Sequence, residues 1–378
     1  MVALKEIFKI SKGKKEEETE NESRLSPRYI QIEDLRHNDN LKYCIPNKKS
    51  VYVNKHDLII AWDGANAGTI GVGLEGVIGS TLARLELKNN KVNPYYAARF
   101  LQSKFQYLRD NCTGATIPHI SKTVLENLSI PLPPLETQKK IVEVLDMAQG
   151  LIDARKEQIR LMDELIQSVF YEMFGDPVTN PKGWETGTIN DLTLKTQYGT
   201  SKKAHETGGE YPMLRMNNIS YTGGWDFSSL KYVDLDENEL EKYLVYEGEL
   251  LFNRTNSKEL VGKTAVYRES KPMAYAGYLV KLITNTKGNT EYISAYLNSQ
   301  HGKATLLNMA KSIVGMANIN AEELKKIRIN LPPIDVQNDF ADIVSRIEKE
   351  RKKLSESIRN YEDNYSSILQ KAFVGKLF

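Results

Sequence analysis

Short polar loops that carry Lys, Arg, Asn and Ser side chains occur at matching places in both halves of the sequence. Such side chains reach the phosphate oxygens and base edges of nucleic acids. A single polar loop is more often a solvated turn, but the matching positions with different residues favour two binding sites with different targets. The candidate nucleic-acid contacts of the first half are Lys12, Lys14, Lys15, Trp62, Asn66, Thr116 and His119. Those of the second half are Lys202, Lys203, Arg215, Asn217, Asn218, Arg254, Asn256, Ser257 and Lys258.

The sequence lacks recognisable catalytic motifs. Residues 71–76 fit the pattern GxGxxG, but residues 77–80 read as a strand, whereas a cofactor site needs a helix there. There is no GxxxxGK[ST] loop for ATP and no GxSxG motif. The five histidines and two cysteines show no metal-site spacing. We therefore expect a chain that is not an enzyme, with no catalytic residue, no metal and no cofactor of its own.

Composition bounds the class of protein. The chain has 378 residues, of which 40% are hydrophobic and 26% charged, and its formal net charge is +2. This profile is typical of a soluble protein with about two to three domains. No apolar run is long enough to span a bilayer, and the charged N-terminus has no apolar segment of a secretory signal. We expect a cytoplasmic protein without membrane contact. The near-neutral charge does not indicate a nucleic-acid binder, which often has a higher pI.

The sequence contains an internal repeat with a period of nearly 200 residues. At a constant offset of 199, Ile120 matches Ile319 and Gln138 matches Gln337. The proline pairs 133–134 and 332–333 match at the same offset. Upstream the offset drifts, which indicates loop insertions in the first part of each copy. Each copy is therefore expected to contain a variable mixed α/β block, a Pro-Pro dipeptide and a helix. The segments 93–108 and 290–307 read as helices inside the blocks.

A seam of apolar residues follows each Pro-Pro dipeptide in alternating steps of four and three. Spacing of 3.5 residues over more than four heptads is typical of a coiled coil. The first seam includes Ile141, Leu145, Ile152, Arg155, Ile159, Met162 and Ile166. The second includes Val344, Ile347, Arg351, Leu354, Ile358, Tyr361 and Tyr365. We predict that the two helices pair with one another rather than packing each on its own block. Arg155 and Arg351 interrupt the seams, either to fix the register or with only their stems in the seam.

These elements predict an α+β architecture with pseudo-two-fold symmetry. Two mixed α/β domains, residues 1–134 and 176–334, are expected to be separated by two long antiparallel coiled-coil helices, residues 135–175 and 335–378. At about 1.5 Å per residue, such helices would hold the two blocks roughly 40–60 Å apart. Two readers at that spacing could engage one face of B-DNA about one or more helical turns apart.

With these features in place, the chain resembles the DNA-specificity (S) subunits of type I restriction–modification systems along its whole length. The most specific segments are residues 130–138 with the long helix that follows, and their second copy from Asn330 onward. The loops GANAGTIG at Gly64 and NRTNSKELVGK at Asn253 also look like segments of these subunits. Thr137 and Val336 depart from the family pattern, in which Glu is frequent at these positions.

The resemblance implies a function and a set of partners. Residues 1–134 and 176–334 look like target recognition domains, each of which reads one half of a bipartite double-stranded DNA target, and the helices look like the spacer that fixes the gap. The implied partners are two methyltransferase (M) subunits with S-adenosylmethionine, while two restriction (R) subunits with ATP are left open. The alternatives are a self-sufficient DNA methyltransferase or nuclease, and a coiled-coil protein adaptor.

Overall fold

The computed structural model describes the whole chain except residues 21–22, 24–25, 38, 115 and 314–315. For residues 311–313 it describes the backbone and not the side chains. The described chain divides into two compact units. One unit contains residues 1–155 and 357–378, and the other contains residues 156–356. Each unit therefore contains one variable block and one half of each of two long helices. The four-part division at residues 134, 175 and 334 stays a prediction, because the compact units cut across both helices.

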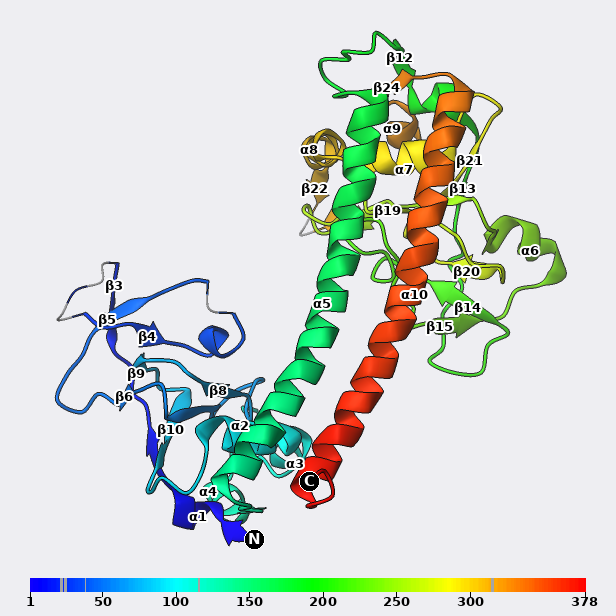
Figure 1. Ribbon diagram of the computed structural model, residues 1–378. Helices are drawn as coiled ribbons and strands as arrows, with labels where there is room; N and C mark the ends of the chain where they lie inside the picture. The colour runs from blue at the N-terminus through cyan, green and yellow to red at the C-terminus, as the bar shows by residue number, and fades with distance from the viewer. Residues whose placement is uncertain (21–22, 24–25, 38, 115, 314–315) are drawn as a thin grey trace. The chain divides into compact units, whose positions relative to one another are not determined.

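The first unit is built around a four-stranded antiparallel sheet in the order β2-β10-β7-β8. Strands β8 and β10 of this sheet are labelled in Figure 1. Its strands are β2 (Phe8–Lys12), β10 (Leu82–Leu87), β7 (Leu58–Ala61) and β8 (Ile70–Val72). A smaller sheet joins β4 (Tyr29–Ile30), β9 (Gly76–Ile78) and β6 (Tyr52–Val53), and two pairs join β1 (Val2–Ala3) to β11 (Ser129–Ile130) and β3 (Glu17–Thr19) to β5 (Tyr43–Ile45). The short helices are α1 (Leu4–Ile7), η1 (Glu33–Leu35), α2 (Pro94–Ser103), α3 (Phe105–Asp110) and α4 (Lys122–Asn127).

The second unit repeats this plan. Its four-stranded sheet has the order β13-β21-β17-β19, from β13 (Thr193–Tyr198), β21 (Leu279–Thr284), β17 (Leu250–Asn253) and β19 (Thr264–Val266). A second sheet joins β15 (Lys231–Val233), β14 (Tyr211–Leu214), β20 (Met273–Tyr275) and β16 (Leu244–Val245). Smaller sheets join β12 (Glu185–Thr188) to β24 (Arg328–Leu331), and β18 (Thr255–Asn256) to β23 (Met316–Asn318) and β22 (Lys311–Ile313). The short helices are η2 (Ile189–Leu192), α6 (Glu237–Tyr243), α7 (Thr290–Asn298), α8 (Gln300–Met309) and α9 (Ala321–Lys325).

The correspondence extends to the direction of strand pairing. In the first unit β9 pairs parallel with β4 and antiparallel with β6, and in the second unit β20 pairs parallel with β14 and antiparallel with β16. The central strands β7 and β17 are buried at every residue. Such strands read as short continuous apolar runs instead of alternating patterns. The predicted internal repeat is thus present in the fold.

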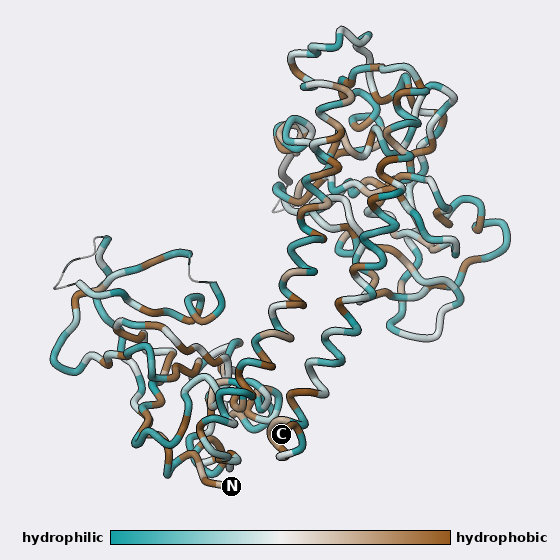
Figure 2. Tube along the Cα trace, viewed as in Figure 1, coloured by the Kyte–Doolittle hydropathy of each residue, from teal (hydrophilic) through white to brown (hydrophobic). Residues whose placement is uncertain are grey.

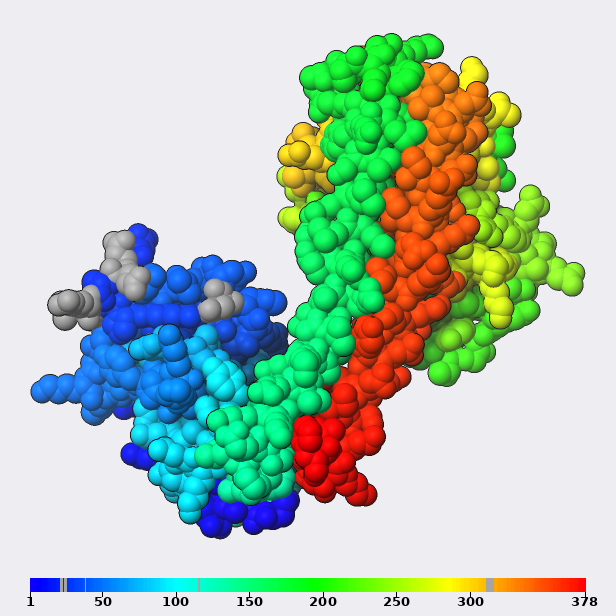
Figure 3. Space-filling model, in the orientation of Figure 1, coloured from blue at the N-terminus to red at the C-terminus, as the bar shows by residue number. Residues whose placement is uncertain are grey.

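Two helices of 40 residues, α5 (Leu135–Phe174) and α10 (Ile334–Phe373), form an antiparallel pair. In the first unit Ile141 of α5 shares a core with Ala372 of α10, and in the second unit Phe170 of α5 shares a core with Phe340 of α10. The start of one helix thus lies beside the end of the other. Figure 2 shows hydrophobic segments recurring along both helices, and Figure 3 shows their surfaces in contact within the second unit. The predicted fold class is confirmed.

One buried glutamine in each copy connects its long helix to its block. The Asn93 amide donates to Gln138 Oε1 at 2.8 Å, and the Asn289 amide donates to Gln337 Oε1 at 2.9 Å. Each glutamine Nε2 donates to two backbone carbonyls, at 3.0 and 2.8 Å in both copies. Neither glutamine is exposed to solvent. Asn93 and Asn289 cap α2 and α7, so both glutamines fix the start of a core helix relative to the spacer.

Candidate nucleic-acid interface

The loop that follows the central strand makes the same cross-chain contact in both units. In the first unit Asp63, just after β7, forms a backbone bridge with His119. In the second unit β18, just after β17, pairs Thr255 with Asn318 of β23. The positions match, since His119 and Asn318 are separated by the repeat offset of 199. Each unit therefore presents one pair of side chains at an equivalent edge.

In the first unit this pair consists of two ionisable side chains. His119 Nδ1 lies 2.6 Å from Asp63 Oδ1, and Lys12 Nζ lies 2.7 Å from Asp63 Oδ2. Burial by itself would raise the pKa of the Asp63 carboxyl, but hydrogen bonds from Lys12 and His119 lower it below its ordinary value. The Asp63 side chain is 16% exposed, whereas those of Lys12 and His119 are 48% and 45% exposed. The two exposed side chains are therefore held by a carboxylate beneath them.

In the second unit the corresponding pair is neutral. Asn318 Nδ2 donates to Thr255 Oγ1 at 2.9 Å. Next to it, the guanidinium of Arg254 lies 4.9 Å from the centre of the Tyr198 ring, which is close enough for a cation–π contact. Tyr198 is itself fixed, because its hydroxyl accepts a hydrogen bond from the Ala321 amide at 3.1 Å.

The two units place a cation and an aromatic ring in opposite order. Lys12 ends β2 and Tyr198 ends β13, the corresponding strand. Trp62 follows β7 and Arg254 follows β17. In the first unit the cation is at the strand end and the aromatic ring is in the loop. In the second unit the aromatic ring is at the strand end and the cation is in the loop. Two sites built this way present different donors and acceptors on one framework.

Several other predicted residues of the first half lie apart from this pair. Lys14, Lys15 and Thr116 are exposed, and Trp62 is half-buried against the core. The Asn66 side chain accepts a hydrogen bond from Arg36. The structure brings Lys12 and His119 together through Asp63.

Some predicted residues of the second half have partners within the protein. Lys202 forms ion pairs with Asp236 at 3.1 Å and with Glu239 at 2.5 Å. Asn218 is 1% exposed, and its side chain bonds the Arg215 amide and the Asp226 carbonyl, so it supports its own loop in this conformation. Lys203, Asn217 and Lys258 are exposed, and Arg215, Arg254, Asn256 and Ser257 are half-buried.

Four residues of these sites were not among the predicted contacts: Asp63, Tyr198, Thr255 and Asn318. Asn318 could have been found by adding the repeat offset to His119. Tyr198 and Asp63 had no such signal, because their roles depend on strand ends that only the folded sheet brings together.

The spacer residues occupy buried or half-buried positions. Ile141, Leu145, Ile152, Val344 and Ile347 are buried. The others are half-buried: Arg155, Ile159, Met162, Ile166, Arg351, Leu354, Ile358, Tyr361 and Tyr365. Arg155 hydrogen-bonds the hydroxyl of Tyr361 and thereby lowers the pKa of this phenol. Arg351 pairs with Asp163 of α5. Both arginines therefore contact the partner helix.

The described part of the chain lacks two kinds of feature. No group of three or more His, Cys, Asp and Glu side chains in this part of the chain is arranged to hold a metal ion. None of the helices within it is both long and apolar enough to cross a membrane.

Comparison with known families decides the classification. The model of the type I restriction modification DNA specificity domain matches residues 1–161 and 181–360. The chain belongs to this family. As a member of the DNA-specificity family, it carries the domain twice, and the two matches correspond to the two copies of the repeat.

Curated relatives have the same description. The chain is 32% identical over 197 residues to the type I restriction enzyme MjaVIII specificity subunit of Methanocaldococcus jannaschii, a match that covers 51% of this chain and 45% of the relative. It is 26% identical over 286 residues to the type I restriction enzyme EcoKI specificity subunit of Escherichia coli strain K12, covering 70% of this chain and 61% of the relative. The chain thus spans about half to three fifths of the length of these specificity subunits.

Solved structures share the fold of this DNA-specificity family member. The S subunit of a type I restriction-modification system from M. genitalium superposes with a TM-score of 0.55 at 14% identity, over 98% of this chain and 95% of that one. A chain from a structural study of complex assembly in the type I R-M system gives a TM-score of 0.57 at 18% identity, over 100% and 97%.

Proposed function

We propose that the chain is the non-catalytic specificity subunit of a type I restriction–modification complex, in which each variable block reads one half of a bipartite DNA target. One observation carries the proposal: a shared framework holds different side chains at equivalent edges. Gln138 and Gln337 make the same hydrogen bonds, while His119 and Asn318 differ in chemistry. Base contacts specify sequence, so two readers of different half-sites require this combination of constant support and variable tips.

The helix pair is the part that would set the gap between the half-sites. Its two helices are continuous over 40 residues each. An α-helix has a fixed rise of about 1.5 Å per residue, so its length is a rigid measure in a way that a loop is not. The gap in the target is then a property of α5 and α10, and the bases read are a property of the blocks.

Catalysis would come from partner subunits: two methyltransferase subunits with S-adenosylmethionine and, where the system has them, two restriction subunits with ATP. The outer face of α5 supports such docking. It exposes Met147 (64%) and Leu151 (54%) in the first unit, and Leu161 and Leu165 in the second. Within each unit the two residues are four positions apart and therefore lie on one face of the helix, and such exposed apolar groups favour a protein-binding surface. At the repeat offset α10 has polar residues instead: Arg346, Glu350, Asn360 and Asn364. We therefore assign partner docking to α5, in the cytoplasm where the host DNA lies.

Methylation mapping of host DNA, with and without the gene, tests the proposal. A bipartite motif with two specified half-sites and a fixed unspecified gap should disappear when the gene is deleted. A contiguous motif, or no loss of any motif, would refute the two-reader function. Binding of S-adenosylmethionine by the purified chain alone would favour a self-sufficient methyltransferase instead.

A further inference from the structure

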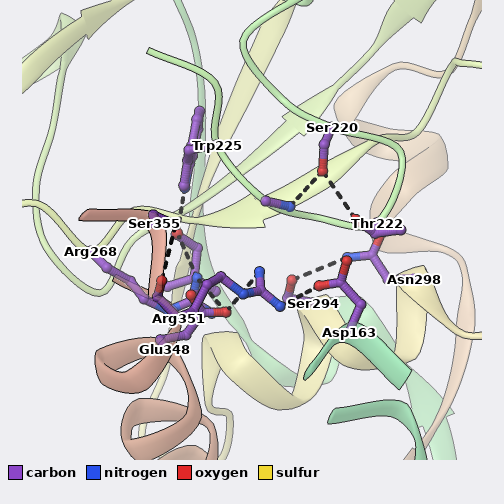
Figure 4. A network of polar contacts seen from close by, with 12 residues as sticks. Asp163, Ser220, Thr222, Trp225, Arg268, Ser294, Asn298, Glu348, Arg351 and Ser355 are labelled. Atoms are coloured by element: carbon purple, nitrogen blue, oxygen red, sulfur yellow. Dashed lines mark hydrogen bonds and ion pairs between the residues drawn. The ribbon is translucent and has the colours of Figure 1, made fainter. Parts of the chain in front are cut away.

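A chain of alternating charges connects the helix pair to the variable block within the second unit (Figure 4). Asp163 of α5 pairs with Arg351 of α10. Arg351 Nη1 lies 3.3 Å from Glu348 Oε1, and Arg268 Nη1 lies 3.9 Å from the same oxygen. Arg268 then forms a bidentate ion pair with Glu291 of α7, in which Nε lies 2.8 Å from Oε1 and Nη2 lies 2.5 Å from Oε2. Five side chains from four segments are thus joined in sequence.

These groups are largely withdrawn from water. The side chains of Glu291, Arg351 and Glu348 are 14%, 15% and 18% exposed, and those of Asp163 and Arg268 are both 25% exposed. A fully exposed ion pair contributes little to stability. Removing one partner of a mostly buried pair is more disruptive, because it leaves a poorly solvated charge behind. The network is therefore able to hold the segments that it connects.

The loop 215–230, between β14 and β15, lies against this network. Thr222 and Gly223 line one narrow cavity together with Asp163, Glu348 and Arg351. A side-chain carbon added at Gly224 would lie 3.7 Å from Arg351 Nη1. The loop approaches α7 so closely that only glycine fits at position 223, where an added carbon would lie 2.5 Å from Asn298 Nδ2 and φ is +91°.

Residues 222–224, which face the network, are followed directly by residues that hydrogen-bond to the predicted base-contacting part of the same loop. Trp225 is held by its ring nitrogen, which donates to the Val266 carbonyl at 2.8 Å. The next residue, Asp226, exchanges hydrogen bonds with Asn218 through its amide and its carbonyl, both at 2.8 Å. Asn218 follows the exposed Asn217 directly. These two hydrogen bonds connect residues 223–226 to the segment that contains Asn217.

The first repeat has a different arrangement at these helix positions. At the repeat offset of 199, Ile152 stands in place of Arg351 and Gln149 in place of Glu348. Ile152 is buried and Gln149 donates to Asp153 of its own helix. The charged network is thus a property of the second copy.

We propose that Asp163, Glu348 and Arg351 are positioning residues for the loop 215–230, so that the helix pair helps to determine the bases accepted by the second reader. This inference rests on the proposed function. It assigns the spacer a role in the accuracy of one half-site, in addition to a role in the gap.

Amide hydrogen exchange on the full chain gives the first test, and it requires neither DNA nor partners. Arg351→Met removes the charge and retains much of the side-chain length. We expect the amides of Gly224 and Asp226 to exchange about tenfold faster, while the amides of residues 31–36, the corresponding segment of the first repeat, are unchanged. The matched control is Arg160→Met, since Arg160 is exposed and pairs with Glu157 and Glu164 of its own helix α5.

Methylation mapping of the variant complex gives the second test. Arg351→Met should make the half-site read by the second repeat degenerate and leave the other half-site and the gap unchanged. A purely structural defect would lower methylation of the whole motif without changing its sequence. If Arg351→Met fails to fold, Asp163→Asn and Glu348→Gln remove one charge at nearly constant shape. The control is Glu350→Gln, at an exposed position of α10 where Glu350 pairs with Lys353 of the same helix.

Three results would overturn the inference: loop exchange equal to that of the control, equal relaxation of both half-sites, or a looser loop with unchanged sequence preference. They differ from failure of the proposed function, in which the unmodified chain gives no bipartite motif at all.

Discussion

His119 and Asn318 occupy the same position in the two repeats, and each bonds to the loop that follows the central strand of its own sheet. His119 faces the carboxylate of Asp63, whereas Asn318 faces the hydroxyl of Thr255. The backbone around the two pairs is alike, so the difference lies in side-chain chemistry. The pair at this edge is therefore ionisable in the first unit and a neutral amide and hydroxyl in the second.

The first prediction concerns acid stability. Hydrogen bonds from Lys12 and His119 lower the folded-state pKa of Asp63 below its ordinary 3.8. A depressed carboxyl pKa stabilises the fold above the unfolded-state pKa, and this stability is lost as the pH falls from about 3.8 through the folded-state value. In urea unfolding, Asp63→Asn should be less stable than the unmodified chain at pH 7, and the difference should shrink below pH 4. A difference that stays constant down to pH 2 would contradict the assignment.

The second prediction concerns sequence reading. Arg254→Ala removes a guanidinium held on the Tyr198 ring, and we expect a loss of about 1–3 kcal/mol in discrimination at one base pair of one half-site. The measurement is methylation of DNA substrates with single base changes across both half-sites. Lys203→Ala, at an exposed loop position, serves as comparison and should weaken binding evenly across sequences. Equal effects of Arg254→Ala on both half-sites would argue against a reading role.

The third prediction concerns the buried glutamines. Replacing Gln138 or Gln337 by Leu leaves the Asn93 or Asn289 amide and two carbonyls without their partner. We expect a loss of about 2–3 kcal/mol of unfolding free energy for either variant. Gln370→Leu, at an exposed position of α10, should change stability by less than about 0.5 kcal/mol. Urea unfolding at neutral pH provides the values, and a strong effect in one repeat alone would break the equivalence of the two positions.

The fourth prediction concerns the gap. Insertion of one heptad into both α5 and α10 keeps the seam in register and lengthens each helix by about 10 Å. At about 3.4 Å per base pair, the methylated motif should gain about three unspecified base pairs with unchanged half-sites. An insertion of four residues disrupts the seam and serves as comparison. If the heptad insertion changed the bases of both half-sites, the helices would not act as a simple spacer.

Much of the fold was predictable because the sequence contains two copies of one pattern, which can be compared with each other. The offset that relates Gln138 to Gln337 also relates the two seams, and the long helices lie where the Pro-Pro dipeptides predict them. Helix breaks inside the blocks were not predictable. The segment 290–307 reads as one helix, but it ends at Asn298 and restarts after Ser299, whose hydroxyl caps α8 by accepting from the Gly302 amide. The segment 93–108 breaks similarly at Lys104.

The kinds of side chain at the candidate interface were predictable, but the individual positions were less so. Lys and Asn in polar loops are natural nucleic-acid contacts, yet Asn218 is buried inside its loop and Lys202 is paired with two carboxylates. Hydrogen-bond partners distant in sequence decide these outcomes, and a loop sequence does not contain them. The nucleic-acid contacts themselves stay predictions.

The most direct test of the two-reader account is to replace residues 1–134 with the corresponding block of another specificity subunit. Methylation would then be mapped at single-base resolution in host DNA together with the methyltransferase subunits. We predict that one half-site changes to that of the donor, while the other half-site and the gap stay as in the unmodified complex. A change in both half-sites, or in neither, would contradict the central claim that each block reads its own half of the target.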